Sequence, residues 1–212
     1  MTGDESGDAS IAAWVLELAQ VGNVRPYPRK SLLIREGELG TSLFVLLEGR
    51  IRIFSEDQDG HRFVFGAFGP GTIFGEVSLD SGPRTASVEA LTDCRCADVP
   101  YTELYQRMAK DQGFAMTLLA ELIRRSRAST MRIKSLALDT VYQRLRTLIE
   151  LESTEQDGMR CLGPELSQQE IANRLGASRD MVTRIFRDLT KGEYIETSRG
   201  GTRILKPLPR EW

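Results

Sequence analysis

The spacing of apolar positions changes along the chain, and each change predicts a different kind of element. The first apolar group, Ile11, Trp14, Val15 and Leu18, falls on one face of a short helix. From residue 24 to residue 97 the period shortens to two, and apolar runs alternate with turns that contain Gly, Asp or Pro. We therefore predict strands at residues 31–34, 43–47, 50–55, 62–67 and 86–90, a pattern typical of a compact antiparallel barrel or roll.

Helical spacing returns near residue 100 and continues through a long run from Asp111 to Leu136. Small or apolar residues in this run recur with spacings of four and three, as they do along a coiled-coil seam, so two copies of the helix are expected to pair. The seam consists of Ala115, Leu119, Leu122, Ser126, Ser129, Ile133 and Leu136. Its centre carries hydroxyls where Leu is usual. Small polar residues in a coiled-coil seam weaken the pairing of the two helices. They either set the register of the pair or contact something other than protein.

A further helix is predicted at residues 139–152, followed by a polar, flexible loop at 153–163 and then by a pair of short helices. Ser167 and Glu170 have the spacing of a capping box at the start of the first short helix, and Gly176 marks the turn after it. Ser178 caps the second helix. Its inward face is formed by Val182, Ile185, Phe186 and Leu189, which leaves Arg179, Asp180, Thr183, Arg184 and Arg187 outward.

Residues 194–206 predict a hairpin that turns at Gly200–Gly201 and carries Arg199 and Arg203. Two helices joined at a glycine and followed by such a hairpin are typical of a winged helix-turn-helix. In that unit the second helix enters the major groove of double-stranded DNA. Arginine reads guanine and a carboxylate accepts from cytosine, so we expect Arg179, Asp180 and Arg184 to contact bases. Phosphate contacts are expected from Ser167, Gln169 and Ser178.

Charge distribution supports this placement of a DNA-binding unit. The 212-residue chain has a net charge of −2, but residues 160–212 hold 10 Lys and Arg against 7 Asp and Glu. The acidic excess therefore lies in the rest of the chain. Residues 1–10 are acidic without an apolar core, so a disordered leader is expected there. No stretch has the ~20 apolar residues that a membrane span needs, so no membrane partner is expected. Three cysteines cannot form a closed set of disulfides, so we expect a reducing, cytoplasmic compartment.

The remaining motif runs from Ile73 to Val88 and predicts a site for a phosphate and a sugar. Gly75 permits close approach of the backbone to a ligand, and Glu76 opens a short helical turn whose N–H groups favour an anion. Gly82 and Pro83 turn the chain so that Arg84 returns to this point with a fork suited to phosphate. Glu76 can accept from a sugar hydroxyl. An Arg84–Glu76 ion pair that merely closes the turn is the alternative.

This motif closely resembles the phosphate-binding cassette of cyclic-nucleotide-binding domains, and the long helix resembles the dimerisation helix of the Crp/Fnr family of transcription regulators. The resemblance implies a cAMP or cGMP site formed by Gly75, Glu76, Val77, Ser78, Arg84 and Thr85, with Ser129 and Thr130 at the adenine. Two features depart from the family pattern. The spacing from Glu76 to Arg84 is eight residues, which shortens the loop at 80–83, and Thr85 accompanies cyclic GMP in some relatives. Both leave the nucleotide open.

The resemblance implies an α+β fold: a β-roll at residues 11–110, a dimerisation helix at 111–137 and a winged helix-turn-helix at 138–212 with a hinge near residues 137–139. We expect a homodimeric transcription regulator that responds to cAMP bound in the β-roll and that binds a palindromic operator and RNA polymerase. Thr183, Arg184 and Arg187 would contact DNA together with the wing. The alternatives are the same fold with another ligand or none, or a cyclic-nucleotide-binding protein that does not bind DNA.

An enzyme is not expected, because no nucleophile, base or metal set accompanies the carboxylates of Glu76 and Asp80. With three cysteines and the single His61, the sequence predicts no metal site, haem or iron–sulfur cluster.

Overall fold

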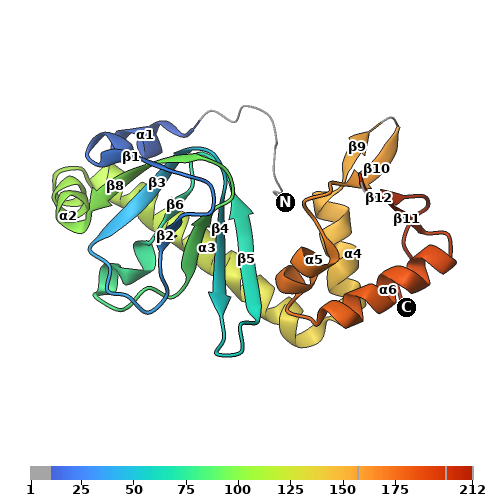
Figure 1. The fold of residues 1–212 in the computed structure, drawn as a ribbon. Helices are drawn as coiled ribbons and strands as arrows, with labels where there is room; N and C mark the ends of the chain where they lie inside the picture. Colours follow the sequence, from blue (N-terminus) through green and yellow to red (C-terminus); the bar gives the residue numbers. More distant parts are fainter. Residues whose placement is uncertain (1–10, 157, 199, 212) are drawn as a thin grey trace. The chain divides into compact units, whose positions relative to one another are not determined.

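The computed structural model describes residues 11–156, 158–198 and 200–211. The predicted leader at residues 1–10 and the predicted wing residue Arg199 lie outside the described residues. The chain divides between Arg127 and Ala128 into two compact units, and each is described by itself below (Figure 1). Strands and helices combine as the predicted α+β fold requires.

The N-terminal unit contains two four-stranded antiparallel sheets, as the period-two pattern predicted. The first sheet has the order β1 (Asn23–Tyr27), β8 (Cys94–Pro100), β3 (Ser42–Glu48) and β6 (Ile73–Phe74). The second has the order β2 (Leu32–Ile34), β7 (Ser87–Ala90), β4 (Ile51–Glu56) and β5 (Arg62–Phe68). Non-consecutive neighbours within both sheets make this a roll rather than a meander.

Strand β3 is buried on both faces, and this explains its nearly continuous apolar sequence. Phe44 and Leu46 belong to a core that also contains residues of the second sheet, such as Val88. Leu43 and Val45 alternate with them and face a second core, formed with α1 (Ala13–Gln20), α2 (Tyr101–Lys110) and the start of α3 (Gln112–Leu138). Each fully buried Leu or Val contributes roughly 1.5–3 kcal/mol to folding.

Five strands were predicted close to their observed bounds, but β1, β6 and β8 were not predicted. Strand β8 buries Cys94, Cys96, Ala97 and Val99, and Cys96 is fully buried. Burial raises the pKa of Cys96 to about 12, so its thiol stays protonated and acts as a small apolar side chain. Cys94, Cys96 and Cys161 are free thiols.

The long helix α3 begins after Asp111, whose carboxylate accepts from the N–H of Phe114 at 3.0 Å. It spans 27 residues, about 40 Å at 1.5 Å per residue. Phe114 and Leu118 are buried against the roll. Leu122, predicted as a seam residue, is partly buried against the same core, because it falls on the roll-facing side of the helix. Leu119 and Ile133 of the seam remain 48% and 67% exposed.

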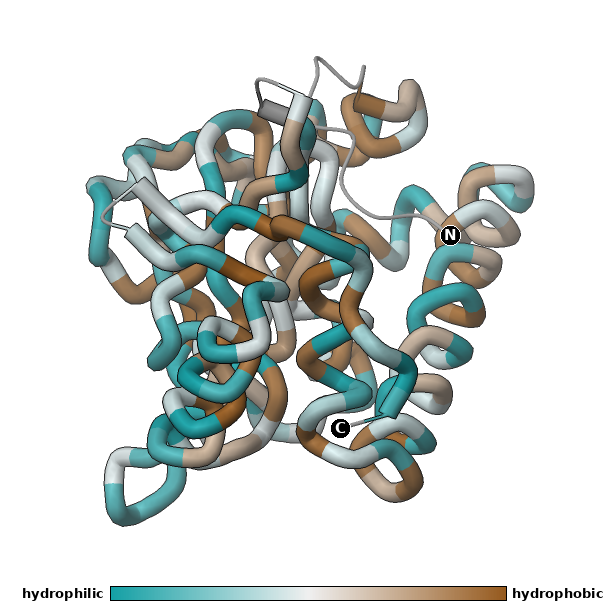
Figure 2. Tube along the Cα trace, turned by 90° about the vertical axis from the view of Figure 1, so that its right-hand side faces the viewer, coloured by the Kyte–Doolittle hydropathy of each residue, from teal (hydrophilic) through white to brown (hydrophobic). Residues whose placement is uncertain are grey.

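The C-terminal unit contains the predicted helices and wing. Helix α4 (Val141–Glu152) begins with a capping box formed by Thr140 and Gln143. Helices α5 (Gln168–Leu175) and α6 (Arg179–Lys191) follow, and the wing consists of β11 (Ile195–Ser198) and β12 (Gly201–Ile204). Their apolar faces share one core, in which Leu145, Ile171, Val182 and Leu189 are fully buried. Apolar and polar stretches alternate along the helices in Figure 2.

The prediction of a flexible loop at residues 153–163 was wrong. The segment forms a hairpin of β9 (Thr154–Gln156) and β10 (Met159–Leu162), and β10 pairs with β12 to extend the wing into a four-stranded sheet. Its polarity misled the prediction because most of the described hairpin side chains are exposed and only Leu162 is buried. Strand pairing here depends on backbone hydrogen bonds with a strand about forty residues later in the chain.

Candidate functional site

The predicted cassette lies between β6 and β7. Gly75 has a φ of 83° and precedes a 3₁₀ helix, η1 (Glu76–Asp80), where a short helical turn was expected to begin. Ser81 adopts a φ of 69°, and the Asp80 carboxylate accepts from the N–H of Gly82 at 2.9 Å. The left-handed serine and this side-chain bond close the shortened loop. They show how an eight-residue spacing is accommodated.

Arg84 is the most completely engaged polar residue of the cassette, and only 8% of it is exposed. Its Nη1 donates to the carbonyl of Gly75 at 2.5 Å and to the hydroxyl of Tyr101 at 3.0 Å. Its Nη2 donates to the carbonyl of Ser42 at 2.6 Å. Within the described part of the chain, the Nε–H and the second Nη2–H have no acceptor. Two donors on neighbouring nitrogens therefore remain for an oxyanion.

Two glycines lie directly against this guanidinium. A Cβ placed on Gly40 would come within 2.4 Å of Arg84 Cζ, and one placed on Gly75 within 2.6 Å of Nη1. Both distances are far shorter than a van der Waals contact, so a larger residue at either position would displace Arg84. The sequence pointed to Gly75 but not to Gly40, which lies 44 positions before Arg84.

The alternative ion pair between Arg84 and Glu76 is not formed. Glu76 instead pairs with Arg125 of α3, with 3.0 Å between Oε1 and Nη1. The same Nη1 donates to the carbonyl of Ile73 at 2.7 Å, and Arg125 Nε donates to Glu121 at 2.8 Å. Hydrogen bonds from Arg124 and Arg125 lower the pKa of Glu121. Sequence analysis missed Arg125, whose only signal was a basic residue on the helix that the cassette was expected to face.

The other cassette residues divide between the interior and the surface. Val77 is 54% exposed and Thr85 is also exposed. Ser78 is 1% exposed, and its Oγ makes no hydrogen bond of normal geometry to the described residues, although it lies near enough to the Tyr101 hydroxyl to help lower that group's pKa. Burial nevertheless raises the pKa of Tyr101, so its hydroxyl is protonated at neutral pH and can donate.

Ser129 and Thr130 lie on the exposed surface of α3, in the C-terminal unit. Their contact with a ligand therefore stays a prediction. A different contact in this part of α3 was not predicted: Arg132 Nη2 donates to the carbonyl of Arg174, in the last turn of α5, at 3.3 Å. Burial, together with the charge of Arg174, lowers the pKa of Arg132. The end of α3 is thus tied to the first short helix of its own unit.

The helix pair forms as its caps predicted. The Ser167 hydroxyl accepts from the N–H of Glu170 at 3.2 Å, and the Ser178 hydroxyl accepts from the N–H of Met181 at 3.2 Å. The reciprocal half of the predicted capping box is replaced, because the Glu170 carboxylate pairs with Arg174 at 3.2 Å. Gly176 ends α5 in the left-handed conformation with a φ of 60°, which places α6 across α5.

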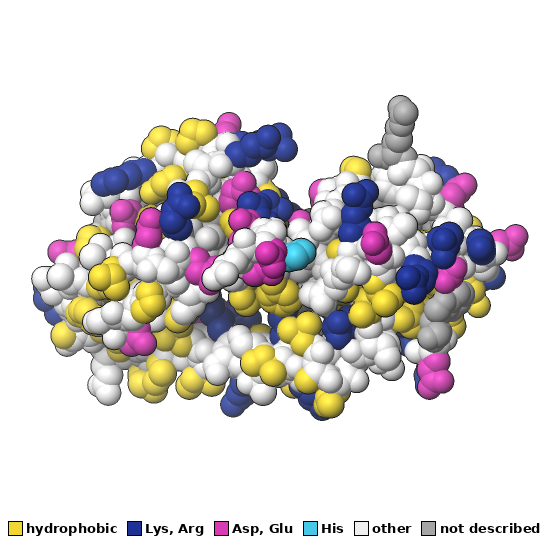
Figure 3. All heavy atoms as spheres, turned by 60° about the horizontal axis from the view of Figure 1, so that its bottom comes forward, with side chains coloured by type: hydrophobic (Ala, Val, Ile, Leu, Met, Phe, Trp, Pro, Cys, Tyr) yellow, Lys and Arg dark blue, Asp and Glu magenta, His cyan; other side chains and the backbone are white. Residues whose placement is uncertain are grey.

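The outer face of α6 is polar and exposed. It comprises the five predicted residues Arg179, Asp180, Thr183, Arg184 and Arg187, while Ser167, Gln169 and Ser178 are exposed beside it. The Thr183 hydroxyl donates to Gln168, and Arg187 lies 3.8 Å from Asp188. Among the described residues, Arg179 and Arg184 pair with no carboxylate. In the wing, Arg203 lies 3.5 Å from Glu196 on the paired strand. Lys and Arg side chains stand among acidic and apolar ones on the face shown in Figure 3.

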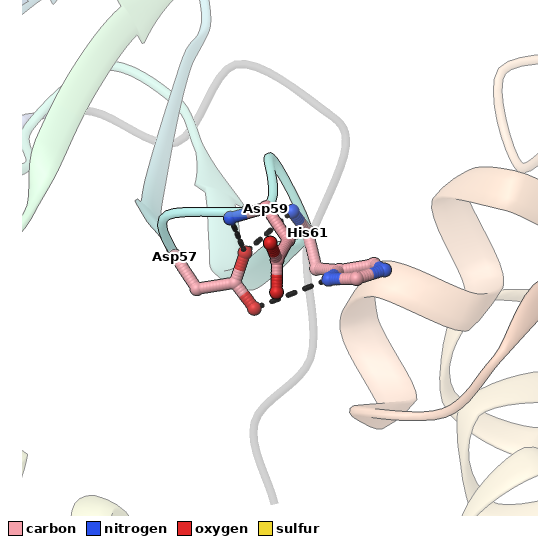
Figure 4. Close-up of side chains that lie close together, drawn as sticks. All are labelled: Asp57, Asp59 and His61. Carbon is pink, nitrogen blue, oxygen red and sulfur yellow. Dashed lines mark hydrogen bonds and ion pairs between the residues drawn. The ribbon is translucent and has the colours of Figure 1, made fainter.

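One cluster on the turn between β4 and β5 has the composition of a metal site. Potential ligand atoms of Asp57, Asp59 and His61 lie within 4.8 Å of one another (Figure 4). Asp57 Oδ1 accepts from the N–H groups of Asp59 and His61, both at 2.9 Å, and these bonds account for the arrangement as the closure of a turn. His61 is largely exposed. Turn closure alone explains the cluster, and we assign it no ligand.

Both units match families of known proteins. Residues 24–111 match the cyclic nucleotide-binding domain, and residues 143–208 match the Crp-like helix-turn-helix domain. The cAMP-activated global transcriptional regulator CRP of Haemophilus influenzae is 31% identical over 175 residues, which cover 79% of this chain and 77% of that protein. The CRP-like cAMP-activated global transcriptional regulator of Mycobacterium tuberculosis is 30% identical over 192 residues, covering 88% of this chain and 84% of that protein.

The chain belongs to the Crp/Fnr family of transcription regulators. A solved structure, that of the c-di-GMP responsive global regulator CLP of Xanthomonas campestris, superimposes with a TM-score of 0.77 at 26% identity, covering 93% of this chain and all of that one. The chain is thus a cyclic-nucleotide-responsive, DNA-binding regulator, and its relatives are regulators rather than enzymes. None of the helices that the structure describes is both long and apolar enough to cross a membrane.

Proposed function

We propose that the β-roll binds cAMP, with the cyclic phosphate at the Nε–H and the remaining Nη2–H of Arg84. The observation that carries this proposal is the anchoring of the guanidinium by Gly75, Ser42 and Tyr101, which spares two donors for a ligand. An anchored cation loses little rotational freedom on binding, which favours affinity. Amide groups of Gly75, Val77, Ser78 and Thr85 complete the phosphate site in this proposal.

Glu76 then accepts from the ribose hydroxyl, and Arg125 stabilises its charge. Glu76 is paired with Arg125, and a carboxylate can only accept hydrogen bonds, which suits a hydroxyl and disfavours a second phosphate. Ser129 and Thr130 contact the base from the dimerisation helices. Ligand binding biases the hinge near residue 139, so that the two recognition helices of a homodimer lie one DNA turn apart.

Titration calorimetry with cAMP, cGMP and cyclic di-GMP tests the ligand. We expect cAMP to bind with the highest affinity. The Arg84→Ala variant should lose at least ~30-fold in affinity, because truncating a buried charged contact costs about 2–4 kcal/mol. Equal cAMP affinity for the variant and the wild type would refute the phosphate site. Preferential binding of cyclic di-GMP, to which the CLP regulator responds, would retain the fold and replace the nucleotide.

On the DNA side, Arg179, Asp180 and Arg184 read base edges while Ser167, Gln169, Ser178, Arg187, Arg199 and Arg203 hold phosphates. Arg184 and Arg179 make no ion pair with the described residues, so neither must give up a carboxylate to meet DNA. Binding to the preferred palindrome and to each single-base variant, at fixed salt, distinguishes the two roles. Arg184→Ala should cost about 1–3 kcal/mol and relax one base preference per half-site. If the variant loses affinity equally for all DNA sequences and its base preferences are unchanged, Arg184 contacts the DNA backbone instead.

The wing has a smaller role in this proposal. Arg203→Ala should lower the affinity for all DNA sequences by a similar factor and reduce the salt dependence of binding. RNA polymerase is the proposed downstream partner of the DNA-bound dimer, and recruitment of polymerase to a promoter fragment tests it in a gel-shift assay.

A further inference from the structure

The hydroxyl of Tyr101 lies between two elements of the cassette. It donates to the carbonyl of Gly75 at 2.6 Å and accepts from Arg84 Nη1 at 3.0 Å. Nη1 itself donates to the same Gly75 carbonyl at 2.5 Å, so three polar groups form a closed triangle. The opposite Nη2 is fixed at Ser42. Rotation of the guanidinium would break one side of this triangle.

The position of the Tyr101 hydroxyl is set by its ring, which packs in the hydrophobic core. Tyr101 is the first residue of α2 and is 8% exposed, with its ring in the core that contains Leu43, Val45 and Leu104. Its N–H donates to the carbonyl of Thr41 at 3.0 Å, next to the segment that carries Gly40 and Ser42. The hydroxyl therefore has a fixed position that is set by packing rather than by Arg84.

We infer that Tyr101 is a positioning residue for Arg84: its hydroxyl holds Nη1 against the Gly75 carbonyl and so determines which guanidinium donors face the ligand. Without the hydroxyl, Nη1 keeps one acceptor, and the guanidinium can turn and offer other donors. The inference about affinity rests on the proposed nucleotide site, whereas the inference about the guanidinium does not.

The test uses the full-length protein with Tyr101→Phe, which keeps the ring in the core and removes only the hydroxyl. Tyr105→Phe is the matched control. Tyr105 lies one turn later in α2, and its hydroxyl donates to the carbonyl of Leu79 at 2.8 Å without contacting Arg84. Thermal unfolding of both variants reports whether either change disturbs the roll, and we expect midpoints close to that of the wild type.

The first measurement is made without ligand. Nitrogen-15 NMR gives the rate of rotation about the Cζ–Nη1 bond of Arg84, assigned with an Arg84→Lys sample. Rotation should be at least about 3-fold faster in Tyr101→Phe, since one of the bonds that restrain Nη1 is lost. It should match the wild type in Tyr105→Phe. An unchanged rate in Tyr101→Phe would overturn the inference, whether or not the protein binds a nucleotide.

The second measurement is the affinity for cAMP. Tyr101→Phe should bind about 3- to 10-fold more weakly, the effect of losing one ordinary hydrogen bond. In an Arg84→Lys background the same change should have almost no effect, because a residue that acts through the guanidinium has nothing left to position. An equal loss in both backgrounds would overturn the inference. Absence of binding to cAMP, cGMP and cyclic di-GMP by the wild type would refute the proposed function alone, and the rotation rate would still decide the role of Tyr101.

Discussion

Replacing Gly40 by alanine should impair nucleotide binding although Gly40 need not touch the ligand. A Cβ at this position would lie 2.4 Å from Cζ, 2.5 Å from Nε and 2.7 Å from Nη2 of Arg84. The φ of Gly40 lies outside the left-handed region, so the substitution adds no backbone strain. The whole effect must therefore come from the collision with the guanidinium.

The magnitude follows from the distances. Ordinary van der Waals contact begins at about 3.4 Å, so the guanidinium has to move by about 1 Å. A shift of that size can lengthen the 2.6 Å bond from Nη2 to Ser42 to about 3.6 Å, beyond hydrogen-bond range. Stability should fall by only about 1–2 kcal/mol, because the displaced end belongs to a flexible side chain that can reach water. Affinity for cAMP should fall by about 10-fold or more.

The assay is calorimetric titration of Gly40→Ala with cAMP, beside Arg84→Ala and the double variant. Gly40→Ala should come within about 3-fold of Arg84→Ala, and the double variant should add little, since both changes act on one group. Gly69→Ala is the control, because a Cβ there meets nothing within 4 Å and its φ is ordinary. If Gly40→Ala binds cAMP within 2-fold of the wild type, the guanidinium does not hold the ligand from its observed position.

Three further predictions concern the rest of the chain. Arg125→Gln should lower the free energy of unfolding of the roll by about 1–2 kcal/mol in urea titrations, because it leaves the nearly buried Glu76 carboxylate without its cation. Arg124→Gln is the control and should cost much less, because it removes a 67% exposed partner of Glu121. Ile133→Glu should convert the proposed dimer to a monomer at micromolar concentration in sedimentation velocity, while the neighbouring Lys134→Glu should not. Thr140→Ala should destabilise the C-terminal unit by about 1 kcal/mol in urea unfolding, since the capping box at α4 loses its hydroxyl, and an unchanged midpoint would contradict that role.

Local patterns predicted the C-terminal unit well because its determinants are close together in sequence. The apolar spacing of Val182, Ile185, Phe186 and Leu189 placed all four in the core, and the serine caps of α5 and α6 were found where expected. In each case the interacting groups lie within two helical turns. Helix spacing and capping are properties of such short segments, so one sequence is enough to recognise them.

Strands were harder to predict where pairing rather than periodicity decided the structure. Strand β6 has only two residues and pairs with β3. Strands β9 and β10 are polar, and β10 pairs with β12 of the wing. Neither case leaves a repeating apolar signal. The exposed face of a strand pair can carry almost any polar residue, so its sequence resembles that of a loop.

The residue types of the candidate site could be predicted from the sequence, but the hydrogen-bond and ion-pair partners of those residues could not. Its local signals, Gly75, Glu76 and Arg84, could be read from a single motif. The partners that decide their state come from elsewhere: Ser42 lies 42 positions from Arg84, and Arg125 lies 49 positions from Glu76. A charged side chain can choose among many acceptors within its reach, and only the folded roll determines which of them are close.

This difference changes what the motif means chemically. From the sequence, an ion pair between Arg84 and Glu76, which would satisfy both charges and leave nothing for a ligand, remained as the alternative to a ligand site. In the structure each charge is met by another group, Arg84 by carbonyls and a phenol and Glu76 by Arg125. Because carbonyls carry no net charge, no carboxylate among the described residues balances the charge of Arg84, and two of its donors have no acceptor there. A guanidinium held in this way can bind a phosphate without first breaking an ion pair, and this is the physical reason to assign the site to an anionic ligand.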